Sequence, residues 1–303
     1  MHIQSILALT DLSTQGRRAV MRAGLIAAEH RALLKILYAA PALGGRGESD
    51  AAARTSALAR DIAARFGILV KCLAHAPGGA PLAEVAEAAC RADLLVVDAG
   101  SARCGAGVFG TSPIARLLRV AACPVLVTQR EALHRYRRLL VAVDFTPASK
   151  RMVALAWALD STAQVELFHA LSRAPEGRLR LADASDQALK ACRHQRLGEA
   201  RERMFWLSDS AAGRDRRVVS AIGQGDPARQ AAVQQQASGA ELLVVGRQRR
   251  SRFVDFLLGS VAQRVLRMAT ADVLVVPHDG CAAPDAVAGP RGGGSVRATG
   301  SAA

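Results

Sequence analysis

The chain has 303 residues, half of them hydrophobic, and a formal net charge of +14 at pH 7. This length predicts about two domains, and no apolar run approaches the roughly 20 residues that a membrane helix needs. The N-terminus lacks a basic segment followed by a long apolar one, so no signal peptide is expected. Together these properties favour a cytoplasmic protein.

The positive charge by itself does not predict a nucleic-acid partner. Nearly all of it is arginine, and the abundance of Ala, Arg and Gly indicates a GC-rich coding bias. Aromatic residues, which could stack on bases, make up only 4% of the chain. The six cysteines form no C-x-x-C pair and have no histidine at ligand spacing, so neither a disulfide framework nor a metal site is expected.

The first half alternates apolar runs with segments of helical spacing. Strands are expected at residues 6–11 (ILALTD), 33–39 (LLKILYA), 93–98 (DLLVVD) and 123–128 (CPVLVT). A helix is expected at residues 17–30, and another begins in GAPLAEVAEAA at residues 79–89. The strands are continuous apolar runs, which is typical of a sheet covered by helices on both faces.

The second half repeats this order after a polar link at residues 131–138. LLVAVD (139–144) matches the strand at 6–11, and QVELFHA (164–170) matches the strand at 33–39. ELLVVG (241–246) matches the strand at 93–98, and ADVLVV (271–276) matches the strand at 123–128. GDPARQAAVQQ (225–235) corresponds to GAPLAEVAEAA (79–89), and both begin with Gly-x-Pro. Ser13 and Thr146 occupy the positions expected for helix N-caps.

The repeat predicts an α/β chain of two tandem doubly wound domains, each a Rossmann-like, five-stranded parallel sheet. We expect domain 1 at residues 1–130 and domain 2 at residues 131–278, packed as an intramolecular pseudo-dimer. Residues 279–303 are rich in Gly and Ala and are predicted to be a disordered tail. Trp157 and Trp206, both in helical segments, are expected to be core or interface anchors.

These residues together resemble the universal stress protein family in its tandem form, over about residues 3–278. The resemblance rests on strands ending in Asp11 and Asp144, the two Gly-x-Pro segments, the V-V-G loop, and G-S-V before the last helix. It implies a fold similar to the adenine nucleotide alpha hydrolases. In members that bind ATP, the loop follows G-x2-G-x9-G-[ST]; its glycines bring main-chain N–H groups to the phosphates at a helix N-terminus.

In domain 2 the resemblance implies a nucleotide site with one departure from this pattern. Gly246, Gly259 and Ser260 are kept, but Arg249 replaces the second glycine. Its guanidinium can pair with a phosphate, whereas its backbone lacks the freedom of glycine. The implied site residues are Ala142, Val143, Asp144, Ala170, Val245, Gly246, Gln248, Arg249, Gly259, Ser260 and Val261.

Domain 1 departs further from the family loop. It keeps Asp11, Gly100, Gly110 and Thr111. Asp98 replaces the first glycine, one residue is deleted there, and a further residue follows Gly110. Because a carboxylate repels phosphate groups, nucleotide binding is expected in domain 2 and not in domain 1.

The resemblance implies a non-enzymatic stress-response protein that senses ATP, with Mg²⁺, through domain 2. The alternative is a nucleotide-independent module that binds a protein partner, and a third reading is a weak ATPase. A Walker loop and a G-x-G-x-x-G fingerprint are both absent from the sequence. The residues leave open the protein partner and whether the pseudo-dimer forms a further homodimer.

Overall fold

The computed structural model describes residues 2–43, 49–75, 79–100, 112–173, 185–211, 218–247 and 261–278. The elements of the first half are β1 (Ser5–Thr10), α1 (Thr14–His30), β2 (Leu33–Tyr38), α2 (Ala51–Phe66), β3 (Val70–Cys72), α3 (Leu82–Cys90), β4 (Leu94–Asp98), α5 (Pro113–Val120) and β5 (Val125–Thr128). Those of the second half are β6 (Arg138–Ala142), α6 (Pro147–Leu159), β7 (Gln164–Leu171), α8 (Asp186–Ala211), β8 (Val218–Gln224), α9 (Pro227–Ser238), β9 (Leu242–Arg247), α10 (Val261–Met268) and β10 (Asp272–Pro277). The predicted alternation of strands and helices is confirmed in both halves.

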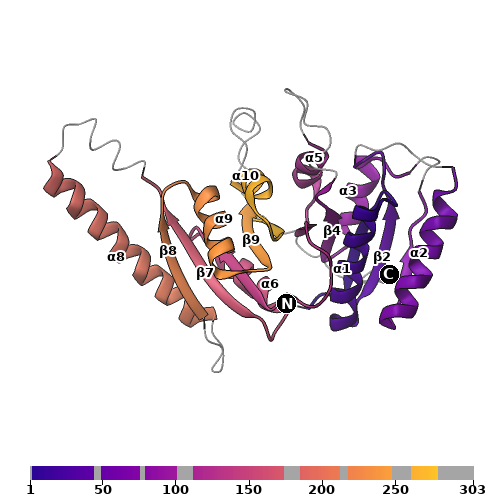
Figure 1. The fold of residues 1–303 in the computed structure, drawn as a ribbon, viewed down its shortest axis with the longest axis horizontal. Coiled ribbons are helices and arrows are strands. Elements are labelled where there is room, and N and C mark those ends of the chain that lie inside the picture. Colours follow the sequence, from indigo (N-terminus) through magenta and orange to yellow (C-terminus); the bar gives the residue numbers. More distant parts are fainter. Residues whose placement is uncertain are drawn as a thin grey trace, which may run out of the picture.

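The ten strands of the described residues form one sheet, in the order β3-β2-β1-β4-β5-β10-β9-β6-β7-β8. Every pair within a half is parallel, and the halves meet where β5 pairs antiparallel with β10. The predicted pseudo-dimer is therefore built edge to edge, with Leu126 opposite Leu274 at its centre. Figure 1 shows the halves side by side, the first in indigo and purple and the second in magenta to yellow.

The strand registers confirm that the two halves are repeats of one unit. Ile6 lies opposite Leu94 in the first half, and Leu139 lies opposite Leu242 in the second. These are the pairs that the sequence repeat aligns. Asp11 and Asp144 consequently follow equivalent strands at the same distance from the paired residues.

Apolar clusters cover both faces of the sheet and run through both halves. One face packs against α1, α2, α6 and α8, and the other against α3, α5, α9 and α10. Successive strand residues alternate between the two clusters; Leu139 belongs to the first and Leu140 to the second. This double coverage is the reason that the strands read as continuous apolar runs.

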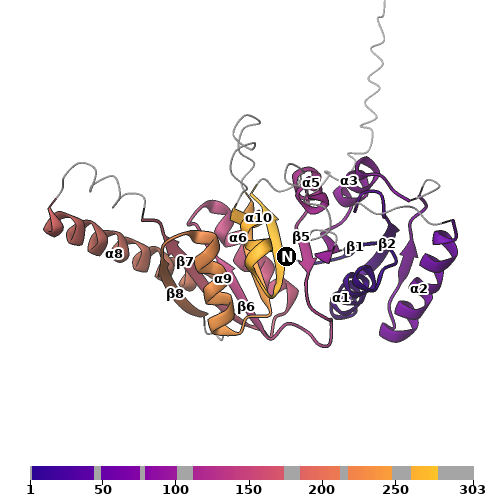
Figure 2. The same cartoon turned by 45° about the horizontal axis from the view of Figure 1, so that its top comes forward.

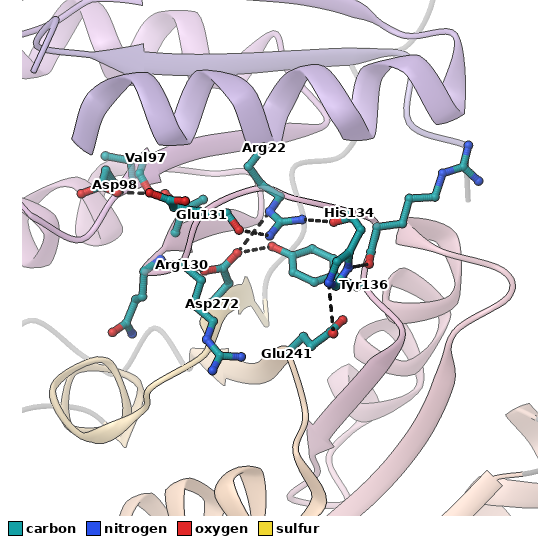
Figure 3. Close-up of polar contacts among 12 residues, drawn as sticks. Arg22, Val97, Asp98, Arg130, Glu131, His134, Tyr136, Glu241 and Asp272 are labelled. Atoms are coloured by element: carbon teal, nitrogen blue, oxygen red, sulfur yellow. Dashed lines mark hydrogen bonds and ion pairs between the residues drawn. The ribbon is translucent and has the colours of Figure 1, made fainter. Parts of the chain in front are cut away.

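A buried polar cluster joins the two halves beside the β5–β10 pair (Figure 3). Asp272, at the start of β10, is fully buried. Its Oδ1 accepts from the main-chain N–H groups of Gln129 at 2.7 Å and Arg130 at 3.0 Å. Its Oδ2 accepts from the Tyr136 hydroxyl at 2.6 Å and lies 3.3 Å from Nε of Arg22.

Arg22 comes from α1 in the first half, so this ion pair crosses between the halves. Its guanidinium also donates to the carbonyl oxygen of His134 at 2.7 Å and lies 4.2 Å from the centre of the Tyr136 ring. Burial, together with the charge of Asp272, raises the pKa of the Tyr136 hydroxyl well above its ordinary value. The hydroxyl therefore stays protonated and can donate to the carboxylate.

The prediction for the two tryptophans is only half right. Trp157 on α6 is buried, but the side chain of Trp206 on α8 is 62% exposed. Helix α8 lies at the outer edge of the sheet, where it contacts β7, β8 and α6. Across the described ranges, no helix has the length and apolar character needed to cross a bilayer.

Candidate functional site

The candidate site lies at the carboxyl ends of β6 and β9, the two central strands of the second half. The chain runs outward from β6 to β8 and then returns to β9 on the other side of β6. In open α/β sheets, the crevice at such a reversal of strand order is where ligands bind. Of the predicted residues, Ala142 ends β6, Val143 and Asp144 follow it, and Val245 and Gly246 lie near the end of β9.

A tight turn after β6 holds the carboxylate of Asp144. Phe145, the next residue, has a φ of 60°, which turns the chain into α6. Oδ1 of Asp144 accepts from the N–H and the hydroxyl of Thr146, at 3.1 and 2.6 Å, and from the Ser149 hydroxyl at 3.0 Å. Partial burial alone would raise the pKa of Asp144, but these hydrogen bonds and the nearby His278 hold it below its ordinary value. The group is therefore a fixed, ionised carboxylate at neutral pH.

Gly246 leaves no room for a side chain. A Cβ there would lie 2.5 Å from Nε2 of His278 and 3.1 Å from the sulfur of Met152. His278 follows β10, and its main-chain N–H donates to the Arg247 carbonyl oxygen at 3.0 Å. Its Nε2 lies 3.8 Å from Oδ2 of Asp144. The imidazole thus covers Gly246 and reaches the carboxylate across the crevice.

Arg247, the first arginine of the RQRR run, takes part in the joint between the halves. One of its guanidinium nitrogens donates to the carbonyl oxygen of Ala121 in the first half, at 3.0 Å. The sequence pattern predicted a phosphate contact for Arg249 of this run and made no prediction for Arg247. The structure shows that the side chain of Arg247 links β9 to the loop before β5.

His169 fixes the backbone on the other side of β6. Its Nδ1 lies 2.8 Å from the carbonyl oxygen of Val143, and its ring lies 4.2 Å from that of Phe145. Burial lowers the pKa of His169, which favours the neutral ring. Because a carbonyl oxygen can only accept, Nδ1 carries the proton in this contact. Ala170, the next residue, lies on β7 opposite Gly223 and is partly buried.

The first half has the same turn but a different crevice. Asp11 accepts from the N–H and hydroxyl of Ser13 at 3.0 and 2.5 Å, and Leu12 has a φ of 64°. The residue equivalent to Ser149 is Gly16, which offers no hydroxyl to the carboxylate. Ser13 itself caps α1, as predicted, accepting from the N–H of Gly16 at 3.0 Å.

Asp98 stands at the position of Gly246 and brings a second carboxyl into that crevice. Its oxygens accept from the N–H of Gly100 at 2.6 Å and from the Thr128 hydroxyl at 3.2 Å. Burial raises the pKa of Asp98, although these two bonds and the charge of Arg18 offset part of the effect. The crevices of the two halves therefore differ at the first position of the family loop, which is Asp98 in the first half and Gly246 in the second.

Several predicted loop residues lie outside the described residues, and their roles stay predictions. They are Gln248, Arg249, Gly259 and Ser260 in the second half and Gly110 and Thr111 in the first; the predicted tail, 279–303, lies outside as well. Val261, at the start of α10, is 42% exposed. Within the described ranges, no group of three His, Cys, Asp or Glu side chains could hold a metal ion.

Residues 135–277 match the model of the universal stress protein family. This half of the chain therefore carries a universal stress protein domain. The match covers most of the predicted second domain, including Asp144 and Gly246, and confirms the resemblance inferred from the motifs. No curated protein matches the chain.

Solved structures extend the likeness in fold to both halves of the chain. A universal stress protein from Archaeoglobus fulgidus DSM 4304 is 17% identical, with 91% of this chain and 97% of that chain covered and a TM-score of 0.62. A functionally unknown protein from Pseudomonas aeruginosa PAO1 is 20% identical, with 91% and 93% covered and a TM-score of 0.65. A universal stress protein in complex with cAMP is 26% identical over 48% of this chain and 99% of that chain, with a TM-score of 0.34. The first two share the tandem fold.

Sequence reasoning missed two contributors to the candidate site. Ser149 completes the set of donors to Asp144, and a signal was present, because a hydroxyl residue lies five positions after the aspartate. His278 comes from the end of β10, and no residue pattern near Asp144 or Gly246 points to it.

Proposed function

We propose that this protein is a cytoplasmic stress-response protein that binds ATP with Mg²⁺ in its second domain and does not turn it over. One observation carries the proposal: Asp144, an ionised and hydrogen-bonded carboxylate, faces Gly246 at the reversal point of the sheet. A fixed acceptor and an adjacent position without a side chain are what a nucleoside requires there.

The two groups have distinct chemical tasks in this proposal. Oδ1 of Asp144 is engaged by Thr146 and Ser149, so Oδ2 is the atom that accepts hydrogen bonds from ribose hydroxyls. Gly246 lets the nucleoside approach the main chain. By the family pattern, Arg249 pairs with a phosphate while Gly259 and Ser260 donate from the N-terminus of α10.

The same geometry supports binding in one half only. In the first half, Asp98 places a buried carboxyl at the position of Gly246, near the carboxylate of Asp11. A side chain there reduces the space for a ligand, and its charged form repels phosphate. We therefore propose that the first domain acts as the structural partner of the second.

The second candidate function is a nucleotide-independent interaction module. The observation that favours it is His278, whose ring covers Gly246 and comes within 3.8 Å of Asp144. A nucleoside has to displace this ring before it reaches the carboxylate, which costs binding free energy. If that cost exceeds what the ligand gains, the crevice stays closed and the protein acts through its surface.

Isothermal titration of ATP-Mg²⁺ into the full chain tests the proposal. We expect one site per chain, affinity weakened about tenfold or more in Asp144→Asn, and unchanged affinity in the matched Asp11→Asn variant. Gly259→Val is expected to abolish binding. Absence of heat in both the wild type and Arg249→Gly would favour the interaction module, and release of phosphate from bound ATP would identify a weak ATPase.

A further inference from the structure

The two outer edges of the ten-stranded sheet are unequal. At the edge of the first half, β3 has three residues, whereas β8 at the opposite edge has seven, Val218–Gln224. Edge strands are commonly protected by being short or by carrying charges or proline. β8, with the sequence VVSAIGQ, has neither protection.

Alternate residues of β8 direct their main-chain groups away from β7. Gly225, just after the strand, donates its N–H to the carbonyl oxygen of Leu171 on β7, at 2.9 Å. Because the residues of a paired strand bond alternately to one side and the other, the even-numbered residues of β8 face outward. The outward N–H and C=O groups belong to Val218, Ser220, Ile222 and Gln224.

A groove of about 590 Å³ runs between α8 and this free edge. The α8 wall includes Leu197, Arg201 and Phe205, and the floor includes the side chains of Ser220 and Ile222. Beside the groove, the rings of Phe205 and Trp206 are 64% and 62% exposed, with their centres 5.9 Å apart. Figure 1 shows α8 beyond β8 at the outer end of the molecule. The groove has the position that a further strand of the sheet would occupy.

We propose that a second copy of this chain fills that position, with the two β8 strands paired antiparallel about a two-fold axis at Ala221. Pairing centred there places Ser220 opposite Ile222 of the second copy, and Val218 opposite Gln224. All four outward-facing residues of each strand then find partners. No other register about a two-fold axis uses all of them.

The molecule already uses this mode of association internally. At the β5–β10 joint, two edge strands pair antiparallel, and α5 and α10 lie on the same face of the sheet on either side of it (Figure 2). The same operation at β8 brings two α8 helices together on one face, with Phe205 and Trp206 of each copy over the joint. Burial of an aromatic residue removes about 150–250 Å² from water. Phe205 and Trp206 are each about 60% exposed, so burying these residues from both copies would contribute on the order of 500 Å². A specific interface buries at least roughly 1,200 Å² in total. The paired strands and the groove supply the remainder.

Sedimentation velocity of the full chain between about 1 and 100 µM tests the proposal. We expect a dimer for the wild type and monomers for Ser220→Pro and for the double variant Phe205→Ser/Trp206→Ser. Proline at Ser220 removes an outward N–H without touching the bonds to β7, and edge strands tolerate it. The matched control is Leu69→Ser, which removes a residue that is 78% exposed beside β3 at the opposite edge. It is expected to remain dimeric, and circular dichroism checks that each variant is folded.

A cross-link locates the interface independently of the variants that dissociate it. Residues at a two-fold axis between antiparallel strands have Cα atoms about 4.5–5.5 Å apart, within the range of a disulfide. Under mild oxidation, Ala221→Cys is expected to form a dimer linked between the two copies of residue 221, identified by peptide mapping. A monomeric wild type, a dimer that survives Ser220→Pro, or links formed only through the native cysteines would overturn the proposal. A monomer that instead captures a β-strand peptide would assign the groove to peptide binding.

Discussion

Replacing Asp272 by alanine is expected to uncouple the two halves of the protein. The carboxylate is fully buried and has four close partners: two main-chain N–H groups, the Tyr136 hydroxyl and the guanidinium of Arg22. Arg22 is also buried, with 6% of its side chain exposed, and it belongs to the first half. The substitution leaves a buried cation without its counter-charge at the joint.

The magnitude follows from the kind of pair that is broken. Removing one partner of a buried ion pair costs about 3–5 kcal/mol, because the other charge remains desolvated. Arg22 keeps its hydrogen bond to the His134 carbonyl oxygen and its contact with the Tyr136 ring, which places the estimate at the lower end, about 3 kcal/mol. Asp272→Asn keeps an oxygen for the main-chain donors, so about half of that loss is expected.

Urea unfolding followed by two signals measures both the loss and the uncoupling. Both tryptophans, Trp157 and Trp206, lie in the second half, so fluorescence reports on that half, whereas far-UV circular dichroism reports on the whole chain. The wild-type transitions are expected to coincide, because one sheet spans both halves. In Asp272→Ala both midpoints should fall and the two transitions should separate.

Asp93→Ala is the matched control for this experiment. Its carboxylate also accepts from two main-chain N–H groups, those of Gln4 and Ser5 at 2.8 and 2.9 Å, but within the first half. We expect it to lower stability without separating the two signals in the same way. If Asp272→Ala costs no more than Asp93→Ala and its transitions still coincide, the carboxylate does not hold the halves together.

Two further predictions concern glycine packing and the titration of the candidate site. Calorimetry should show that Gly16→Ala lowers the free energy of unfolding by about 1–3 kcal/mol, because its Cβ would lie 2.9 Å from the Thr10 hydroxyl. Gly198 lies within α8, and a Cβ there would meet no other atom, so Gly198→Ala is expected to raise the free energy of unfolding by about 0.5–1 kcal/mol. A reversed order would refute the packing argument. Ser149→Ala should raise the pKa of Asp144 towards its ordinary 3.8, as followed by carboxyl NMR titration. Because the pKa of Asp144 is lower in the folded state, its contribution to stability is present above pH 3.8 and is lost as the pH falls through the folded pKa. An Asp144 titration that is the same in Ser149→Ala and in the wild type would contradict the assigned hydrogen bond.

The repeated fold and part of the candidate site could be read from local sequence. Continuous apolar runs predict strands covered on both faces, and the two copies of the pattern predict two domains. The aligned pairs, Ile6 with Leu139 and Leu94 with Leu242, have the same register in the structure. Asp144 and Gly246 could be found because each directly follows or ends a predicted strand, where parallel sheets place their ligand-binding residues.

Only the tertiary structure decided how distant segments meet. An apolar last strand looks the same whether its free edge meets water, another sheet or a second chain, so the antiparallel joint between β5 and β10 carries no local signal. His278 reaches Gly246 and Asp144 from the end of a third strand, and Arg22 reaches Asp272 across 250 residues of chain. Trp206, predicted to be a core or interface anchor, is exposed, because β8 is the outermost strand of the sheet formed by the described residues. Apolar patterning and turn chemistry act over a few residues and specify the elements, whereas burial of a charge or an aromatic ring depends on which elements become neighbours in space.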